Sequence, residues 1–388
     1  SQVSAAAKAA ADAITKPEIT SEAGILYDVT NGRVLFEKNA DEKLAPASTT
    51  KLMTALLVLE KSKLDDKVTF SKTAVTNLES GAVKIGLVEG DQVSVKDCLY
   101  GLLLKSANEV ANGLAEHVSG SISAFADLMN AKAKELGCTN THFVNPNGLN
   151  SDQQYTTCRD MAKIAAAAFA NQTLCQIDST LSYKFPATKA AAARTITPGH
   201  KMLYPNDSRY YAGIVGGKTG YTSKAGNTLV TCVEKDGVRM VAVILKSKST
   251  HYEDTKKMLD YGYQYVNTEK GNTTGNSTTT TAKQETAGKW VQDNGSWRYE
   301  FADGTKAVGT IYTIDAADFG FDPDGKMVTG WKMFGTDWYY FESNGTMAKN
   351  AWRQDSGKWF YLGADGKIVR NTTIDNKYKV GADGAWVQ

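Results

Sequence analysis

Apolar and polar positions alternate near the start of the chain and then switch to helical spacing. The segment AGILYDVTNGRVLFEKN (23–39) alternates on both sides of Asn31-Gly32, which predicts a β-hairpin with its turn there. After Pro46, apolar residues recur three and four positions apart, so we expect a helix that begins near Ser48. The same spacing predicts helices through VKDCLYGLLLKSANEVANGLAEHVSG (95–120), through SAFADLMNAKAKELG (123–137), and from a Thr157-x-x-Asp160 capping box through RDMAKIAAAAFA (159–170).

Strand patterns return after these helices. They are YAGIVGGKTG (211–220), NTLVTCVEKDG (227–237) and VRMVAVILKS (238–247), the last two joined by a turn at Asp236-Gly237. A final helix is expected from His251 to Val266. Strands at both ends with helices between them predict an α+β domain in which both ends of the segment share one sheet.

The last quarter of the chain has a different composition. All seven tryptophans lie at or beyond position 290, which indicates a second domain. Before it runs NTEKGNTTGNSTTTTAKQETAG (267–288), a stretch rich in Thr, Gly and Asn that is typical of a solvated linker. We therefore place the boundaries as follows: an N-terminal stub at 1–19, a front domain at 20–266, a linker at 267–287 and a repeat domain at 288–388.

The repeat domain carries turn signals at regular intervals. Asp-Gly or Asn-Gly between aromatic segments predicts hairpin turns, and tryptophans seven residues apart precede several of these dipeptides. Because such short hairpins bury too little surface alone, we expect them to stack into an all-β solenoid. The dipeptides are Asp303-Gly304, Asp324-Gly325, Asn344-Gly345, Asp365-Gly366 and Asp383-Gly384.

Composition narrows the possible functions. A formal charge of +2 gives no reason to expect a nucleic-acid partner, and no apolar run is long enough for a transmembrane helix. The five cysteines and four histidines show no ligand spacing, so we expect neither a metal nor another cofactor, and the cysteines are interpreted as small buried residues. The start of the chain lacks Met and an apolar core, and we interpret it as the polar remnant of a removed signal peptide, which predicts secretion.

Three short motifs carry candidate chemistry: Ser48-x-x-Lys51, Ser106-Ala107-Asn108 and Lys218-Thr219-Gly220. Each motif alone has an ordinary structural explanation. Ser48 could simply be a helix cap, the second motif could lie on a solvated helix face, and the third could be part of a loop. Together and in this order they are much more specific. Ser48 and Lys51 face the same way at this spacing, so the lysine could act as the base that a serine nucleophile needs, while Ser48 also opens the helix.

Residues 20–266 resemble the penicillin-binding DD-peptidases, and most closely the low-molecular-weight D-alanyl-D-alanine carboxypeptidases. Beyond the motifs, LAPASTTKLMTALL, LLLKSANEVANGLAEHVSGS, FVNPNGLNSDQQYTTCRDMAKIA and GGKTGYTSKAGNTLV look like the corresponding family blocks. The resemblance implies a β-lactamase/DD-peptidase-like fold, an antiparallel sheet plus a helical subdomain. It also implies removal of the terminal D-Ala from peptidoglycan stem peptides, and covalent inhibition by β-lactam antibiotics.

The resemblance assigns a role to each motif residue. Ser48 would attack, Lys51 would take its proton, Ser106 would pass a proton to the leaving amine, and Asn108 would hold the substrate and orient Lys51. Lys218 and Thr219 would bind the substrate carboxylate, and Gly220 would let a substrate strand approach closely. The N–H groups of Ser48 and Tyr221 would donate hydrogen bonds to the oxyanion.

Two departures limit this assignment. Position 221 is Tyr where some relatives carry His. The segment RTITPGHKMLYPNDSRYY does not reproduce the family pattern, so a second carboxylate-binding residue stays unassigned among Arg194, His200 and Arg209.

Residues 288–388 resemble the choline-binding and cell-wall-binding repeats of Gram-positive surface proteins. In those repeats two Trp and a Tyr form shallow pockets that can hold a quaternary ammonium by cation–π attraction. The units around GTIYTIDAADFGFDPDG and NTTIDNKYKVGADGAW depart from the pattern, and another wall polymer could replace choline. The matching residues are Trp290, Trp297, Tyr299, Trp331, Trp338, Tyr340, Trp352, Trp359 and Tyr361.

The sequence favours a serine D-alanyl-D-alanine carboxypeptidase held outside the membrane at a Gram-positive cell wall. An endopeptidase acting on cross-links could use the same residues. A class A β-lactamase is disfavoured, because the second motif is Ser-Ala-Asn and no Glu-x-x-Leu-Asn segment is evident. A wall-binding adhesion protein with a relic front domain is the alternative outside enzymes, and the intact motifs argue against it.

Overall fold

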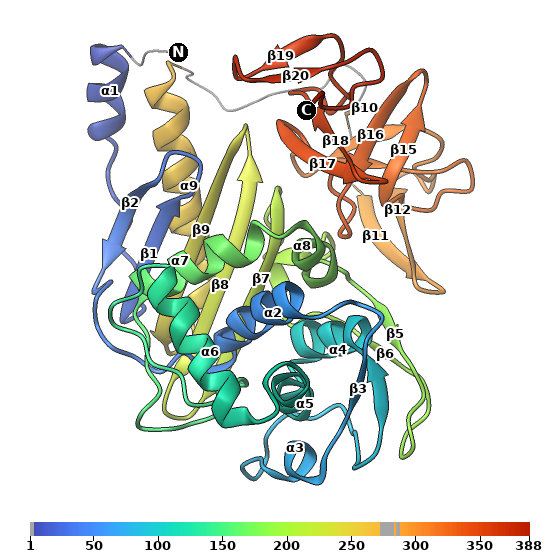
Figure 1. Ribbon diagram of the computed structural model, residues 1–388. Coiled ribbons are helices and arrows are strands. Elements are labelled where there is room, and N and C mark those ends of the chain that lie inside the picture. Colours follow the sequence, from blue (N-terminus) through green and yellow to red (C-terminus); the bar gives the residue numbers. More distant parts are fainter. Residues whose placement is uncertain (1–3, 272–282, 285–287) are drawn as a thin grey trace. The chain divides into compact units, whose positions relative to one another are not determined.

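The computed structural model describes residues 4–271, 283–284 and 288–388 of the chain (Figure 1). Its contacts divide the chain into two compact units. The first comprises Ser1–Lys201, Gly216–Cys232 and Met240–Thr273, and the second comprises Met202–Val215, Val233–Arg239 and Thr274–Gln388. Because this division follows packing rather than chain order, the boundaries at 20–266 and 288–388 stay predictions.

One five-stranded sheet runs through the front part of the chain, in the order β2-β1-β9-β8-β7 (Figure 1). Strand β1 pairs antiparallel with β2 and with β9, so the two ends of the front segment meet in one sheet, as the sequence predicted. Strand β7 lies at the edge and carries Lys218, Thr219 and Gly220. The strands are β1 (Ala23–Asp28), β2 (Arg33–Lys38), β7 (Ile214–Thr222), β8 (Gly226–Lys235) and β9 (Val238–Ser247).

The helices inserted between β2 and β7 form the helical part of the fold. Helix α5 lies at its centre, with every residue from Asn108 to Ala115 buried, and it packs against α2, α3, α4 and α6. Two strand pairs, β3 with β4 and β5 with β6, flank these helices. The elements are α2 (Thr50–Lys61), β3 (Lys67–Thr69), α3 (Lys72–Thr76), β4 (Gln92–Ser94), α4 (Val95–Tyr100), α5 (Asn108–Ser119), α6 (Ile122–Glu135), α7 (Cys158–Phe169), α8 (Gln172–Asp178), β5 (Tyr183–Phe185), β6 (Arg194–Ile196) and the 3-10 turn η3 (Lys201–Leu203).

Helices also cover the sheet. Helix α9 (His251–Glu269) packs against β1 and β2, and α7 packs against β1 (Figure 1). The sequence predicted that α9 ends at Val266, three residues too early. Most of the predicted linker 267–287 lies outside the described residues, since 272–282 and 285–287 are not described. Within it, β10 (Lys283–Gln284) pairs parallel with β13 (Ile311–Ile314).

Part of the predicted N-terminal stub is helical. Helix α1 (Ala5–Asp12) begins at Ser4, whose hydroxyl accepts the N–H of Ala7 at 3.1 Å, and residues 1–3 lie outside the described part. It packs against α9, where the Tyr265 hydroxyl donates to Asp12 at 2.6 Å and accepts from Lys8 at 3.0 Å. The first unit therefore includes residues that the sequence assigned to no element.

The predicted helix through 95–120 is wrong at its middle. Helix α4 ends at Tyr100, a π-helical turn η2 covers Gly101–Lys105, and Ser106 adopts a left-handed conformation with φ +61° before α5 begins. In an unbroken α-helix, Ser106 and Asn108 would point about 200° apart around the axis. The break removes this constraint, so both side chains can face one site.

The capping box at α7 is only half formed. The Thr157 hydroxyl accepts the N–H of Asp160 at 3.0 Å, as predicted. The Asp160 carboxylate does not return to Thr157, because it accepts instead from the Asn140 N–H at 2.8 Å and the Thr141 hydroxyl at 2.7 Å. All five cysteines are buried free thiols, which confirms their interpretation as small core residues.

The C-terminal part of the second unit is a series of β-hairpins, which confirms the all-β repeat architecture. One backbone hydrogen bond recurs along the series, since the N–H groups of Met327, Met347, Ile368 and Trp386 each donate to a carbonyl in an earlier hairpin. Such neighbour-to-neighbour contacts are what a solenoid requires. The hairpins are β11 (Gly288–Asp293) with β12 (Ser296–Phe301), β13 with β14 (Ala317–Gly320), β15 (Gly330–Phe334) with β16 (Asp337–Phe341), β17 (Ala351–Asp355) with β18 (Lys358–Leu362), and β19 (Thr372–Ile374) with β20 (Tyr378–Val380).

The predicted Asp-Gly and Asn-Gly dipeptides do not form the turns of these hairpins. Chain reversal between paired strands occurs at other residues, such as Ser356-Gly357 and Asp315-Ala316, where both residues have positive φ as a type I′ turn demands. The predicted dipeptides follow each hairpin, and each closes a single bridge, for example Leu362 with Ile368 across Asp365-Gly366. Each pair of tryptophans therefore spans a hairpin instead of preceding one.

Candidate active site

Ser48 lies in a 3-10 turn, η1 (Ala47–Thr49), that leads directly into α2. The preceding residue Ala47 has φ +47°, a left-handed conformation that costs a non-glycine residue about 1–2 kcal/mol. Gly148 packs so tightly on this turn that a Cβ there would lie 1.8 Å from the Ala47 carbonyl oxygen. The helix begins near Ser48 as predicted, but Thr49 is the N-cap of α2 and no side chain caps the helix, so Ser48 is not its cap.

Lys51 is fully buried, and its Nζ lies within hydrogen-bond distance of three oxygens. These are Ser48 Oγ at 2.9 Å, Asn108 Oδ1 at 2.8 Å and the Asn147 carbonyl oxygen at 2.7 Å. Two of them can only accept, whereas a hydroxyl can also donate. The amine can therefore donate to Asn108 and Asn147, and in its neutral form it can also accept a hydrogen bond from the Ser48 hydroxyl.

The pKa of the Lys51 amine agrees with this arrangement. It lies well below the usual value, first because burial disfavours the charged form and second because the positive charge of Lys218 acts on it. The Glu109 carboxylate acts in the opposite direction. That carboxylate is itself buried and accepts the N–H groups of Ile85 at 3.0 Å and Gly86 at 3.1 Å.

The orientation of the Asn108 amide follows from its second partner. Its Nδ2 donates to the Val83 carbonyl oxygen at 3.0 Å, which leaves Oδ1 facing Lys51. Asn108 thus links the Ser48–Lys51 pair to the segment at Val83. The spacing of the second motif in the sequence does not indicate this contact.

Ser106 faces the third motif. Its hydroxyl accepts from Lys218 Nζ at 3.1 Å, and the same Nζ donates to the Thr219 carbonyl oxygen at 2.9 Å. The left-handed backbone at Ser106 is the kind of strain that persists where surrounding structure holds it, and it is common at functional sites. The three motifs therefore form two pairs, Ser48 with Lys51 and Ser106 with Lys218.

Lys218 is buried, and burial lowers its pKa to about 8, while the Asp178 carboxylate acts to raise it. Asp178 accepts the N–H of Gly217 at 2.6 Å, next to Lys218 in the edge strand. Burial raises the pKa of Asp178 to about 7, against the opposing effects of the Gly217 N–H and Lys218. The sequence did not single out Asp178, because its partner is a backbone group 39 positions away.

Gly220 packs against the nucleophile's backbone. A Cβ at this position would lie 2.7 Å from the Ser48 nitrogen and 2.4 Å from Thr228 Oγ1. The absence of a side chain thus keeps the Ser48 N–H accessible, a reason that differs from the predicted approach of a substrate strand. Thr219 is partly buried, and the Tyr221 side chain is 66% exposed.

The three candidates for a second carboxylate-binding residue have other partners. Arg194 donates to the backbone carbonyl of Ile85 at 2.9 Å, and Arg209 pairs with Asp207 at 2.8 Å. His200 is buried, its Nε2 lies 2.8 Å from the Thr231 hydroxyl, and burial lowers its pKa to about 3. These contacts identify none of the three as the second carboxylate-binding residue.

The aromatic residues predicted for the first repeat are core residues. Trp290, Trp297 and Tyr299 are each less than a tenth exposed. The Trp290 ring packs edge-on against Phe319, with centroids 4.8 Å apart. A ligand could reach them only if this packing moved.

The later repeats leave more of their rings accessible. Trp338 is 38% exposed, and Trp331, Trp352, Trp359 and Tyr361 are partly buried. Tyr340, by contrast, is buried, and the guanidinium carbon of Arg353 lies 5.8 Å from its ring centre.

Trp352 lies in a cluster that the sequence did not predict. Its ring centre is 5.6 Å from that of Tyr378 and 6.5 Å from that of Trp386, and these two rings are 5.6 Å apart. Both partners come from the last repeat, the unit around NTTIDNKYKVGADGAW, which departs from the repeat pattern because it lacks the tryptophan pair. A lone Trp386 could have been recognised only from its stacking on the preceding hairpin.

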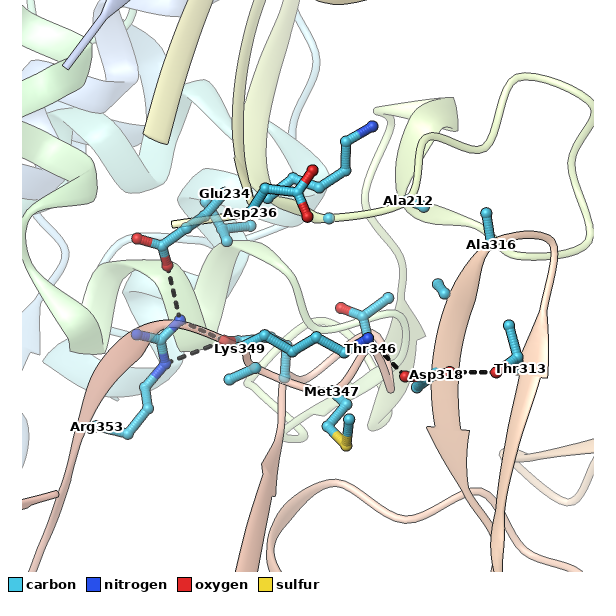
Figure 2. Close-up of a pocket in the computed structure, with 16 residues that line it drawn as sticks. Ala212, Glu234, Asp236, Thr313, Ala316, Asp318, Thr346, Met347, Lys349 and Arg353 are labelled. Carbon is cyan, nitrogen blue, oxygen red and sulfur yellow. Dashed lines mark hydrogen bonds and ion pairs between the residues drawn. The ribbon is translucent and has the colours of Figure 1, made fainter. Parts of the chain in front are cut away.

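A cavity of about 290 Å³ lies within the second unit (Figure 2). Two of its cations are paired with its own carboxylates, since Arg353 contacts Glu342 at 3.0 Å and Glu234 at 3.4 Å, and Lys349 contacts Asp318 at 2.6 Å. None of the three motifs lines it. This cavity therefore takes no part in the chemistry of Ser48.

Three family models match the chain. A family model described as D-alanyl-D-alanine carboxypeptidase matches residues 10–249. Two models described as choline-binding repeat match residues 307–352 and 347–386.

Individual relatives match the front part. The chain is 35% identical over 274 residues to the D-alanyl-D-alanine carboxypeptidase DacC of Escherichia coli K12, covering 67% of this chain and 65% of DacC. It is 34% identical over 258 residues to DacF of Bacillus subtilis, covering 64% and 63%. The chain thus spans less than two thirds of the length of these relatives. The crystal structure of the Streptomyces K15 DD-transpeptidase is similar with a TM-score of 0.58 at 32% identity, over 64% of this chain and 99% of that one.

Replacing Gly220 by Ala should slow the reaction at Ser48. The new Cβ would crowd the Ser48 nitrogen, and losing one oxyanion donor typically costs about 10²–10³ in rate. The rate of labelling by a fluorescent penicillin measures this. The double variant Gly220→Ala/Thr228→Ala removes the second clash and should stay slow, whereas Gly381→Ala, whose Cβ would meet no atom closer than 3.6 Å, should label normally. Normal labelling of Gly220→Ala would show that the Ser48 N–H is not needed.

The pH profile of kcat/KM should fall on its alkaline side near pH 8. The carboxylate-binding role predicted for Lys218 requires its protonated form, and its pKa is about 8, so rising pH removes the charge. Lys218→Arg keeps a permanent charge and should move the falling limb upward. A peptide with an amidated C-terminus should lack this limb. An alkaline limb that is the same for both peptides would contradict carboxylate binding by Lys218.

Proposed function

The chain belongs to the D-alanyl-D-alanine carboxypeptidase family and carries choline-binding repeats, and we propose that it removes the terminal D-Ala from peptidoglycan stem peptides through an acyl-enzyme at Ser48. The observation that carries this proposal is the buried Lys51 amine 2.9 Å from Ser48 Oγ, where burial holds the pKa of the amine well below its usual value. A serine hydroxyl is a weak nucleophile until such a base takes its proton.

The acylation step follows from these contacts. Ser48 Oγ bonds to the carbonyl carbon of the penultimate D-Ala while its proton passes to Lys51 Nζ. The N–H groups of Ser48 and Tyr221 would stabilise the oxyanion that forms. The carbon–nitrogen bond then breaks, and the proton held by Lys51 passes through the Ser106 hydroxyl to the leaving D-Ala amine, which returns Lys51 to its neutral form.

Water completes the cycle. Neutral Lys51 can accept a proton from water as that water attacks the ester, which releases the shortened peptide and restores Ser48. Lys218 and Thr219 would bind the terminal carboxylate, and Lys218 Nζ lies 3.1 Å from the Ser106 hydroxyl that would carry the proton. Carboxylate binding by this pair would favour a free C-terminus over an internal peptide bond.

Related reactions share the acyl-enzyme and differ in the acceptor or the bond cleaved. A DD-endopeptidase would cut cross-links, and one similar structure is named a DD-transpeptidase, an activity in which an amine replaces water. β-Lactams should acylate the same serine. A class A β-lactamase and a non-catalytic adhesion protein remain weaker alternatives, the second because Ser48 and Lys51 are held in bonding contact.

The hairpin repeats would hold the enzyme at its insoluble substrate. Their aromatic rings suit a choline group or another wall polymer, and two attached binding parts raise the effective concentration of one for the other. We accordingly propose a secreted protein associated with the Gram-positive cell wall. Among the described residues, no helix is long and apolar enough to cross a membrane.

The first test is release of free D-Ala from a stem pentapeptide, with mass spectrometry of the peptide product. We expect a tetrapeptide from wild-type protein and a loss of roughly a thousandfold or more in Ser48→Ala and in Lys51→Ala. Ser223→Ala, at an exposed serine, should behave as wild type. A cross-linked dimer would instead indicate a transpeptidase, and equal penicillin labelling of wild type and Ser48→Ala would refute the acyl-enzyme.

The second test measures retention on immobilised choline and on purified wall polymer. Trp352→Ala should weaken choline retention by about tenfold, within the range of a cation–π contact of about 0.5–2 kcal/mol. Val308→Ala, at an exposed apolar residue of the same unit, is the control. Thermal melting checks that Trp352→Ala stays folded. Unchanged choline retention of Trp352→Ala would exclude Trp352 from the choline site, and wild-type protein that binds wall polymer but not choline would exclude choline as the ligand.

A further inference from the structure

A buried carboxylate that the proposed reaction does not use follows Asn108 in the chain. Glu109 lies in the first turn of α5 and is fully buried. Its two oxygens accept the N–H groups of Ile85 at 3.0 Å, Gly86 at 3.1 Å and Leu87 at 3.4 Å. Burying a carboxylate is costly unless hydrogen bonds compensate for the lost water, so these donors explain how it is tolerated in the interior.

The segment that supplies these donors, 83–87, belongs to no helix or strand. Gly86 has φ +98°, a conformation that favours glycine and that turns successive N–H groups toward one anion. Arg194 holds the same segment from β6, because it donates to the Ile85 carbonyl oxygen at 2.9 Å. Side chains from α5 and β6 therefore fix a segment that has no hydrogen-bond ladder of its own.

Asn108 joins this segment to Lys51. The Val83 carbonyl oxygen accepts both the N–H and the Nδ2 of Asn108, each at 3.0 Å, and Asn108 Oδ1 accepts from Lys51 Nζ at 2.8 Å. If 83–87 moved away, Nδ2 would lose its partner, and the amide could rotate and present a donor to Lys51 instead of an acceptor. Asn108 and Glu109 thus contact one segment at two points, and the orientation of the Asn108 amide depends on that segment.

Two charged groups act on the Lys51 amine, Lys218 from β7 and Glu109 from α5. Burial and the charge of Lys218 lower the pKa of Lys51, whereas the Glu109 carboxylate acts to raise it. The hydrogen-bond partners of Nζ are two uncharged side chains and one backbone carbonyl. Of these groups, Glu109 is the one whose charge favours the protonated amine.

We propose that Glu109 is a positioning residue for the reaction at Ser48. It anchors 83–87, so that Asn108 keeps its amide oxygen toward Lys51. Its charge also stabilises the ammonium that forms when Lys51 takes the serine proton. This inference rests on the proposed function, in which Lys51 holds that proton until the leaving amine receives it.

The variant Glu109→Gln removes the charge at nearly constant size. Its amide keeps one acceptor oxygen, but the new NH2 group meets N–H donors. The rate of labelling by a fluorescent penicillin should fall about tenfold at neutral pH, because a less basic Lys51 takes the serine proton less readily. The acid limb of the pH profile should move to lower pH, since Lys51 loses the carboxylate that raises its pKa. The alkaline limb near pH 8, set by Lys218, should stay in place.

Glu116→Gln is the matched control on the same helix. Glu116 lies about two turns after Glu109, and its carboxylate accepts the Ser71 hydroxyl at 3.0 Å. This variant should keep the wild-type rate and both limbs. A carboxylate in the first turn also stabilises a helix, but that role would lower the melting temperature without moving the acid limb. An acid limb that stays in place in Glu109→Gln, or moves equally in both variants, overturns the charge effect.

A pair of glycine variants tests the anchor with Glu109 in place, so the test stands even if Glu109→Gln fails to fold. Gly86 and Gly81 have φ +98° and +80°, and a Cβ at either would meet no atom within 4 Å. Gly86 donates to Glu109, whereas Gly81 lies outside 83–87. Alanine strains both positions, so Gly86→Ala should label about fivefold more slowly than Gly81→Ala. Equal labelling rates overturn the anchor.

Labelling at Ser48 and release of D-Ala report on the two proposals separately. Wild-type protein that labels but releases no D-Ala from a stem pentapeptide overturns the proposed carboxypeptidase, while the labelling rates of the variants still decide the role of Glu109. Wild-type protein that does not label overturns both.

Discussion

Burial of the Lys51 amine is the constraint on which the centre of the first unit depends. An unpaired ammonium in a protein interior costs several kcal/mol, and proteins commonly avoid this cost by releasing the proton. Glu109 is the carboxylate that acts against the release, yet its oxygens accept from the backbone at Ile85 and Gly86. Burial, together with the positive charge of Lys218, therefore favours the neutral form of the amine beside Ser48. The proposed nucleophile and its proposed base are thus a serine and a lysine in direct contact.

Holding that amine in place requires unfavourable backbone conformations in two separate segments. Ala47 and Ser106 both have positive φ, and such residues cost of order 1–3 kcal/mol each. Ala47 turns the chain so that Ser48 and Lys51 meet at short range, and Ser106 breaks a helix so that Asn108 can face Lys51. Close packing by Gly148 against Ala47 leaves the strained turn little room to relax. The strain is thus local, and the surrounding contacts hold it.

Periodicity predicted most helices and strands of the front segment and the common sheet of its two ends, because burying one face imposes a regular pattern. Periodicity gave wrong predictions where a local backbone conformation interrupts that regular pattern. The apolar spacing continues across Ser106, so nothing in it marks the left-handed residue there. In the hairpins, Ser356-Gly357 and Asp315-Ala316 adopt positive φ because the paired strands demand it, although these dipeptides are weaker turn signals than Asp-Gly. Three motifs identified most residues around Ser48, whereas Asp178 and Asn147 act there through single contacts with distant residues.

The aromatic repeats show why similar residues can serve different ends. Trp290 and Trp352 occupy equivalent places in their hairpins, yet Trp290 packs on Phe319 in a core while Trp352 meets Tyr378 and Trp386 and stays partly exposed. The difference comes from the next hairpin in the stack, which supplies the partner rings. Two adjacent repeats together therefore determine whether a tryptophan ring is buried in the core or accessible to a ligand. A repeat that has lost its own pair can still complete the aromatic cluster of the one before it.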